Sequence, residues 1–329
     1  MMKRTDQLIE RIADPDNLRL ACWKAAKGKR HSPPVLLYGR HLDDNLWRLR
    51  QQILSGKVET GNYRYFNIRE PKERRICAPA FSEQVLHHAL MNVCDPYFER
   101  VQIHDSYASR RGRGIHAALQ RAEVCTCRHD WFLKMDVRKF FDSIHHDVLK
   151  AQLAGLFKNE HLLAIFGQII DSFSASEKRG VPIGNLCSQY FANHYLSGLD
   201  HFIKERLRIK AYVRYMDDLV LWHDDKRALI SARQAVEEFV ADRLLCDMKP
   251  VLCNKTPRGL PFLGYLIYPY HTRLLGASQR RFIRKIGIIN ANYETGRWSQ
   301  AKCSRHAATL IAFTQHADAL AFRKKVINT

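Results

Sequence analysis

The chain has 329 residues, enough for about two packing units of ~150 residues each, and its 46% hydrophobic content excludes a mostly disordered protein. Lys and Arg outnumber Asp and Glu by 53 to 33, and this net charge of +20 favours nucleic acid over an anionic membrane surface as the partner. No apolar run approaches the roughly 20 residues of a membrane span, the acidic start excludes a signal peptide, and nine cysteines without a C-x-x-C pair exclude a disulfide framework. We therefore expect an intracellular protein with reduced thiols and no membrane partner.

The first part of the chain is predicted to be helical apart from one strand. Charged helical patterns run to about residue 60 and are broken at Pro33-Pro34. Aromatic and β-branched residues over 63–68 predict a strand. The next helix starts at Ser82, and we expect it to stop near Asp95-Pro96 because proline interrupts a helix interior.

The central segments predict an α+β core. The expected elements, in chain order, are a strand over 131–136, a short helix capped by Asp147, a helix over 186–207, a hairpin of 211–215 and 219–222, a helix over 226–245 and a strand near 248–252. Strand, helix, hairpin, helix and strand in this order form the split βαβ arrangement, with helices on one face of an antiparallel sheet.

Three carboxylates are expected at one edge of this sheet. Asp136 ends the first strand, and Asp217 and Asp218 lie at the hairpin tip. The first strand of a split βαβ sheet neighbours the hairpin, so the three side chains can meet. Clustered carboxylates repel each other and a polyanion unless cations bridge them, and oxygen ligands suit Mg²⁺. Two Mg²⁺ ions would clamp the attacking and leaving oxygens of a phosphoryl transfer. The alternative is that Asp-Asp is ordinary turn chemistry.

The segment Tyr215-Met216-Asp217-Asp218 between apolar strands resembles the signature of reverse transcriptases. Further blocks that resemble this family occur in the right order, at 136–144, 180–189 and 262–265, with weaker likeness at 72–79, at 106–114 and in the basic C-terminal tail. The resemblance implies a right-hand polymerase, α+β in class. It assigns an N-terminal segment and fingers to 1–130, a palm to 131–262 with an inserted fingers portion at about 150–180, and a primer grip and helical thumb to 263–329.

The resemblance also implies roles for individual residues. The catalytic residues would be Asp136, Asp217 and Asp218. Together with Val137 they would hold two Mg²⁺ ions, for which Mn²⁺ could substitute. The nucleotide-binding positions are Lys72, Arg74 (with Arg75 as second choice), Arg138, Phe140, Phe141, Ile183, Gly184, Gln189 and Lys249 (with Lys255 as the competitor). The positions expected to bind template or primer are Arg110, Arg113, Tyr215, Met216, Phe262, Leu263, Gly264, Arg281 and Lys285. The partners implied are an RNA template, a DNA or RNA primer and dNTPs.

Two substitutions within 180–189 narrow the resemblance. Retroviral and group II intron enzymes usually have Gln-Gly followed by Ser-Pro there, whereas this chain has Ile183-Gly184 and Ser188-Gln189. This pattern is similar to the reverse transcriptases of diversity-generating retroelements. These cytoplasmic enzymes of bacteria or phages copy a template-repeat RNA into cDNA with errors opposite adenine, aided by a small basic helical accessory protein. Replacing Gln by Ile removes a hydrogen bond to the nucleotide or template, which favours looser base selection.

Other interpretations stay open. Ile183 can simply pack at the start of a helix. The same fold also serves retron-like, phage-defence and group II intron-related reverse transcriptases, although Ser188-Gln189 argues against the intron relatives. A non-enzymatic RNA-binding module is disfavoured, because the three aspartates would weaken RNA binding without metal ions.

Overall fold

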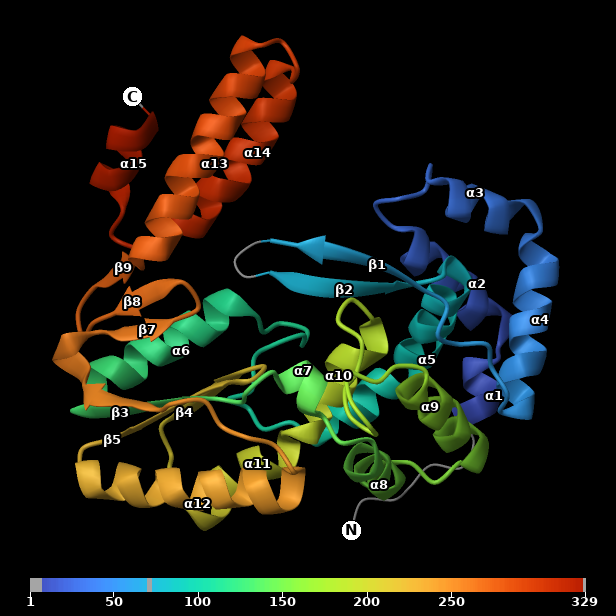
Figure 1. Cartoon of the computed structure of the whole chain (residues 1–329), viewed down its shortest axis with the longest axis horizontal. Coiled ribbons are helices and arrows are strands. Elements are labelled where there is room, and N and C mark those ends of the chain that lie inside the picture. Colours follow the sequence, from blue (N-terminus) through green and yellow to red (C-terminus); the bar gives the residue numbers. More distant parts are fainter. Residues whose placement is uncertain (1–7, 70–72, 328–329) are drawn as a thin grey trace. The chain divides into compact units, whose positions relative to one another are not determined.

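The computed structural model describes residues 8–69 and 73–327 (Figure 1). The chain divides into two compact units, each continuous in space but not in sequence. Unit 1 comprises residues 1–104, 137–206 and 235–249, and unit 2 comprises 105–136, 207–234 and 250–329. Within the described ranges, no helix is both long and apolar enough to cross a membrane. Helices and antiparallel sheets together confirm the predicted α+β class.

Unit 1 is mainly helical. Its helices are α1 (Leu8–Ile12), α2 (Pro15–Ala26), α3 (Pro33–Arg40), α4 (Leu42–Ser55), α5 (Phe81–Arg100), α7 (Phe140–Ser143), α8 (His146–Leu156), α9 (Glu160–Asp171), α10 (Leu186–Tyr195) and α11 (Ser197–His201), followed by a π-helical turn (Phe202–Arg206). Helix α12 (Lys226–Leu244) begins in unit 2 and ends in unit 1. Local capping explains several of their ends. Asp14 accepts hydrogen bonds from the amides of Asp16 and Asn17 at the start of α2, and Gly56 adopts φ 69° just after α4.

Tertiary packing overrides the predicted end of α5. The helix continues through Pro96 to Arg100, so the expected stop near Asp95-Pro96 is wrong. An interior proline costs a helix about 3 kcal/mol or more. Here the helix carries Phe98 into an aromatic cluster, where its ring centroid lies 5.4 Å from that of Phe157 and 6.4 Å from that of Phe191. We infer that burial of Phe98, only 3% exposed, outweighs the cost of the proline.

Two other helix predictions are also corrected. Asp147 is not the cap of α8: His145 occupies that position, and Asp147 lies in the first turn, where its charge suits the helix dipole. The helix predicted over 186–207 is interrupted after α10. There Ser197 donates its hydroxyl hydrogen to the His194 carbonyl oxygen at 2.7 Å, a local bond that competes with regular helix geometry.

A two-stranded hairpin extends from unit 1. β1 (Tyr63–Ile68), which confirms the predicted strand, pairs antiparallel with β2 (Arg74–Pro79). Successive side chains of a strand point to opposite faces. Arg75 and Cys77 therefore lie on one face of the hairpin, and Ile76 lies on the other.

Unit 2 is built on a four-stranded antiparallel sheet. Its strands are β3 (Trp131–Asp136), β4 (Tyr212–Tyr215), β5 (Asp218–His223) and β6 (Leu252–Lys255), in the spatial order β4-β5-β3-β6. This order confirms the predicted split βαβ arrangement. The last strand begins at Leu252 and not near residue 248, because Pro250 has no amide hydrogen for the ladder.

The sheet packs through one face on α6 (Ile115–Arg128). Phe132, Val213 and Trp222 share a buried core with residues of α6, and the indole nitrogen of Trp222 donates to Thr126 Oγ1 at 3.1 Å. The remaining elements of unit 2 are a 3₁₀ turn (Thr256–Arg258), the small sheet of β7 (Leu260–Phe262), β8 (Tyr265–Ile267) and β9 (Thr272–Leu274), and the C-terminal helices α13 (Gly276–Glu294), α14 (Gln300–Thr314) and α15 (Leu320–Ile327).

Candidate active site

Three aspartates lie at one edge of the unit 2 sheet. Asp136 ends β3 and is paired directly opposite Asp218, the first residue of β5. Asp218 is also opposite Tyr215 of β4, so Met216 and Asp217 alone form the turn between these strands. Met216 adopts φ 55°, which is uncommon for a residue with a side chain. The backbone register thus places the three aspartates at one edge of the sheet.

Asp217 resists ionisation in this setting. Burial raises its pKa from 3.8 to about 6, and the negative charge of Asp136 adds to the effect. A hydrogen bond between these two side chains and the charge of Asp218 act in the same direction. A nearby cation would oppose all of the charge repulsion, because it favours the ionised form of each carboxylate.

Asp218 has a cationic neighbour that the sequence analysis missed. Lys134 Nζ lies 3.1 Å from Asp218 Oδ1 and donates to the Pro261 carbonyl oxygen at 3.1 Å. The contact with Asp218 is an ion pair without hydrogen-bond geometry. Lys134 precedes Asp136 by two residues on β3 and so shares its face, and this period-two spacing was the available signal. Asp218 is therefore partly neutralised by the protein itself.

Asp136 and Asp217 fit a divalent cation. Mg²⁺ prefers oxygen ligands and often binds through one or two carboxylates plus substrate phosphates. The mutual repulsion of these two carboxylates is what such an ion would relieve. Across the residues that the structure describes, no group of three or more His, Cys, Asp or Glu side chains could hold a metal ion. Substrate oxygens would therefore have to complete the coordination shell.

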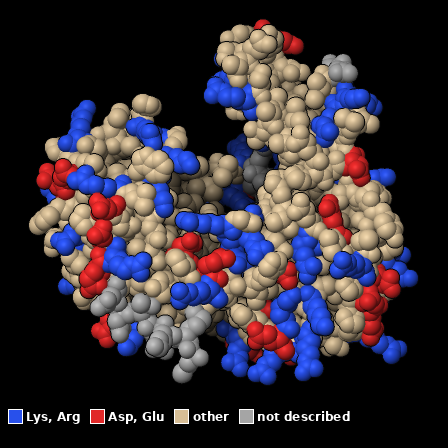
Figure 2. Space-filling view, turned by 180° about the vertical axis from the view of Figure 1, so that it is seen from behind, with Lys and Arg blue, Asp and Glu red and all other residues tan. Residues whose placement is uncertain are grey.

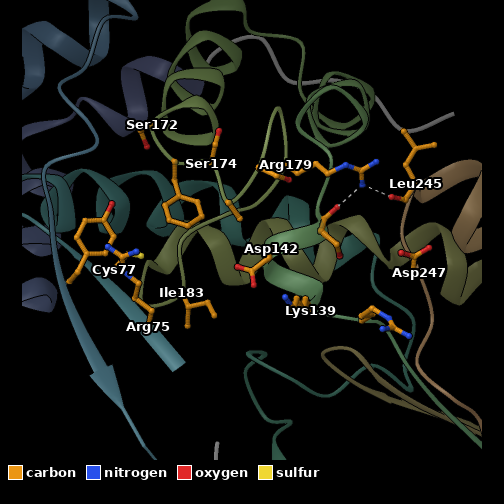
Figure 3. A pocket seen from close by; sticks show the side chains of 16 residues that line it. Arg75, Cys77, Lys139, Asp142, Ser172, Ser174, Arg179, Ile183, Leu245 and Asp247 are labelled. Carbon is orange, nitrogen blue, oxygen red and sulfur yellow. Dashed lines mark hydrogen bonds between the residues drawn. The ribbon is translucent and has the colours of Figure 1, made fainter. Parts of the chain in front are cut away.

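Unit 1 contains a cavity of about 820 Å³ beside the hairpin (Figure 3). Tyr65 and Cys77 line it from the hairpin, and Ile183 lines it from the segment before α10. Its charged lining residues are the cations Arg75, Arg138, Lys139 and Arg179 and the carboxylates Asp142 and Asp247. Because the cations outnumber the carboxylates, the cavity suits an anionic ligand.

The hairpin register separates two neighbouring arginines. Arg75 lines the cavity and places its guanidinium 4.2 Å from the centroid of the Tyr65 ring. Arg74 is exposed on the other face of the hairpin and does not line the cavity. Lys72, the other basic residue expected here, lies outside the described residues. Of the two arginines considered from the sequence, the second choice is thus the one at the cavity.

One wall of the cavity was not anticipated from the sequence. It is formed by residues 172–176 and Arg179. Arg179 Nη1 donates to the carbonyl oxygen of Leu245 at 2.5 Å and to that of Ser143 at 3.4 Å (Figure 3). This arginine therefore anchors two backbone segments. No sequence motif marks it, because its partners are carbonyl groups that every residue carries.

Only some of the other residues predicted to bind the nucleotide lie at this cavity. Arg138 donates its amide hydrogen to the Asp247 carbonyl oxygen at 2.7 Å, and its neighbour Val137 is fully buried. Phe140 is only 2% exposed and packs on Tyr195, so its ring belongs to the core. Four others lie outside the lining of this cavity: Phe141, Gly184, Gln189 and Lys249.

The residues predicted to bind template or primer lie in unit 2. Leu263 and Gly264, both with positive φ, form the tight turn between β7 and β8, and the Gly264 carbonyl oxygen accepts a hydrogen bond from Ser278 Oγ of α13 at 2.8 Å. Phe262 is fully buried in the unit 2 core. The basic positions of this set are Arg110 and Arg113 before α6, and Arg281 and Lys285 on α13. Figure 2 shows Lys and Arg side chains spread widely over the face that it draws.

In the metal-free protein, Asp217→Asn should raise stability at pH 8. Because the folded-state pKa of Asp217 is raised, the fold favours the protonated acid, and this contribution is lost as the pH rises through about 6. The rise from 3.8 to about 6 corresponds to on the order of 3 kcal/mol, which a neutral amide would recover. Thermal unfolding in EDTA should separate the two proteins at pH 8 and not at pH 4. Mg²⁺ should stabilise only the wild type, and identical profiles would contradict this account.

Comparison with known proteins identifies the family to which more than half of the chain is similar. A family model described as reverse transcriptase (RNA-dependent DNA polymerase) matches residues 69–267, more than half of the chain. Protein YkfC of Escherichia coli is 25% identical over 223 residues, which cover 62% of this chain and 58% of that protein. Nuclear intron maturase 1 of Arabidopsis thaliana is 31% identical over 135 residues, which cover 40% of this chain and 19% of that protein. The match spans less than two thirds of either relative.

A solved structure agrees with the family at the level of the fold. Apo telomerase from Candida tropicalis, truncated from the C-terminal domain, is similar with a TM-score of 0.50 and 14% sequence identity. The similarity covers 65% of this chain and 55% of that one. With its antiparallel sheet, its aspartates at the sheet edge and the family match across them, the chain belongs to the reverse transcriptase family.

Proposed function

We propose that this protein is an RNA-directed DNA polymerase, which extends a DNA or RNA primer with dNTPs along an RNA template. The observation that carries the proposal is the half-buried Asp136–Asp217 pair, whose repulsion a divalent cation would relieve. The cation-lined cavity adds support, because Arg138 and Lys139 follow Asp136 by two and three residues along the chain. The carboxylate pair suits a divalent cation and the cavity suits an anion, and each of these properties is one that a nucleotide-polymerising enzyme requires.

The reaction joins the primer to the incoming nucleotide. The primer 3′-hydroxyl loses its proton to solvent water and its oxygen forms a bond to the α-phosphorus. The bond from that phosphorus to the oxygen shared with the β-phosphate breaks, and pyrophosphate leaves. Asp136 and Asp217 would hold Mg²⁺, which when bound neutralises charge on the attacking and leaving oxygens. Arg75, Arg138 and Lys139 would bind the triphosphate oxygens through charge-assisted hydrogen bonds. Lys249 is our candidate for protonating the pyrophosphate.

Further assignments belong to the same proposal. Phe141 would lie under the sugar and exclude a ribose 2′-hydroxyl, and Ile183 would pack near the new base pair. Arg110 and Arg281 would contact template or primer phosphates, which position a nucleic acid without reading its sequence. The division into fingers, palm and thumb is likewise proposed.

The finer proposal is a role in a diversity-generating retroelement. The enzyme would copy a template-repeat RNA with errors opposite adenine, aided by a small basic helical accessory protein. Support comes from Ile183, an apolar side chain that lines the cavity where related enzymes usually carry Gln. Shape alone discriminates bases by modest free energies, so an apolar contact favours infidelity. Cellular location in a bacterium or its phage is part of this proposal.

A second candidate is a group II intron-related reverse transcriptase. It is favoured by the names of two relatives, Nuclear intron maturase 1 and an uncharacterized 91 kDa protein in the cob intron of Schizosaccharomyces pombe, the latter 28% identical over 160 residues, which cover 47% of this chain and 18% of that protein. Retron-like and phage-defence enzymes share the same chemistry. The error spectrum of the cDNA distinguishes these candidates from the mutagenic one.

Asp217→Asn should abolish DNA synthesis and spare RNA binding. Loss of one metal-binding carboxylate removes several kcal/mol of transition-state stabilisation, so we expect a fall of about 10³-fold or more in primer extension with Mg²⁺. The matched control is Asp224→Asn, which alters an exposed carboxylate just after β5. RNA affinity, measured by filter binding, should stay within about twofold for both. Equal loss of RNA binding and synthesis would contradict the enzyme proposal.

The two neighbouring arginines should differ in their contribution to nucleotide binding. Arg75→Ala should raise the KM for dNTP by about tenfold, because a hydrogen bond to a charged group contributes about 1.5–3 kcal/mol. Arg74→Ala, on the other face of the same strand, should change KM by less than about twofold. Steady-state primer extension at varied dNTP measures both. If Arg74→Ala has the larger effect, the cavity is not the nucleotide site.

Ile183→Gln should make copying more accurate. A polar side chain restores a hydrogen-bonding contact near the base pair, and we expect severalfold fewer errors, about five- to tenfold. Sequencing of cDNA made on a mixed RNA template measures the change, with exposed Ile230→Gln as the control. Wild-type errors concentrated opposite adenine would support the retroelement proposal. Accurate copying by the wild type would instead favour the intron-related or defence classes.

A further inference from the structure

A buried acid and a buried base lie behind the cavity on α5. Glu83 is 3% exposed, and His87, one helical turn later, is fully buried. The distance between His87 Nε2 and Glu83 Oε1 is 3.5 Å. Neither residue lines the 820 Å³ cavity, so contact with the nucleotide does not explain them.

Glu83 contacts the segment that leads into the hairpin. Its Oε2 atom accepts a hydrogen bond from the Gly61 amide at 3.1 Å, two residues before β1 begins. Tyr63, the first residue of β1, places its hydroxyl 2.7 Å from Ser172 Oγ, on the far wall of the cavity. The carboxyl group therefore connects α5 to the segment before the first strand of the hairpin.

His87 lies beside the opposite wall. Its ring lines a smaller cavity together with Ile76 of β2 and Gly184. The next residue, Asn185, is fully buried and accepts a hydrogen bond from the Cys187 amide at 3.3 Å. Asn185 thereby caps α10 and directly follows Ile183 and Gly184. One turn of α5 thus contacts both the hairpin and the segment that carries Ile183.

The hairpin and this segment are in direct contact. The Cys77 amide of β2 donates to the Ile183 carbonyl oxygen at 2.8 Å. Gly184 adopts φ 110°, and a Cβ atom there would lie 2.7 Å from Ile76 Cγ2. There is consequently no room for a side chain at this junction. A small movement of the start of the hairpin would therefore displace Ile183.

Stability alone does not account for these polar groups. Several of their atoms make no hydrogen bond within the described residues: Glu83 Oε1, both ring nitrogens of His87 and Asn185 Nδ2. Apolar side chains of similar volume often stabilise a core as well as a buried ionic pair, or better. Burial raises the pKa of Glu83 to about 7 and lowers that of His87 to about 3, so the pair retains one proton over most of this range.

We propose that Glu83 and His87 are positioning residues that hold the β1–β2 hairpin against the Ile183–Gly184 segment and so set the shape of the nucleotide cavity. This inference rests on the proposed function of that cavity. Arg75 extends from the hairpin and Ile183 from the other wall. The spacing that Glu83 and His87 maintain is therefore the spacing between a triphosphate contact and a base-pair contact.

Primer extension by position-83 variants tests the proposal. Glu83→Leu fills the space without an acceptor for Gly61, and we expect the KM for dNTP to rise about tenfold while kcat changes less than about twofold. Glu83→Gln keeps an acceptor and is neutral like the protonated acid, so it should restore the wild-type KM. Leu90→Ala is the control, because Leu90 is fully buried on the same helix face but is apolar and makes none of these hydrogen bonds, so its loss should lower stability without changing KM.

Hydrogen exchange gives a readout that does not need catalysis. Amide exchange at Gly61 and Cys77 should accelerate at least tenfold in Glu83→Leu and His87→Leu and stay at wild-type rates in Glu83→Gln and Leu90→Ala. If the wild type has no polymerase activity but the leucine variants exchange faster at these amides, the proposed function is overturned and the positioning role is kept. Wild-type KM and exchange in both leucine variants would overturn the positioning role and keep the polymerase. If Glu83→Leu does not fold, the same two measurements on His87→Leu decide.

Discussion

The antiparallel pairing of β3 with β5 is the constraint on which the candidate active site depends. Its register places Asp136 opposite Asp218 and brings Lys134 to the same face. A slip of one residue would turn Asp136 to the opposite face of the sheet. The buried core against α6 opposes such a slip, because it would also remove side chains such as Phe132 from that core. Hydrophobic packing on one face thus fixes the carboxylates at the edge.

The consequence of this register is repulsion between carboxylates at the edge of the sheet. Asp136 and Asp217, both half-buried, repel each other, and Lys134 forms an ion pair with Asp218. Unit 1 shows the opposite imbalance, a cavity with more cations than carboxylates. A divalent cation would relieve the repulsion at the sheet edge, and an anionic group would suit the cavity.

The hairpin illustrates how far sequence reasoning extends. Its first strand was predicted correctly from aromatic and β-branched residues, yet the sequence alone ranked Arg74 above Arg75. The register of β2 decides which arginine faces the cavity, and register is set by pairing with β1 and by the bond from Cys77 to Ile183. Likewise Pro96 predicted a helix end, and the aromatic cluster around Phe98 prevailed. Local rules failed where a distant contact contributed more free energy.

By itself, the sequence determined the α+β class, the order of the central strands and the location of three aspartates at one sheet edge, because strand periodicity and the split βαβ topology depend on local patterns and short connections. The family resemblance was also present in the linear motifs. Only the tertiary structure decided that Lys134 pairs with Asp218, that Arg179 anchors Leu245, and that Glu83 accepts a hydrogen bond from Gly61. Those contacts join residues whose spacing follows no local period, so packing of the whole unit, and not neighbouring residues, selects them.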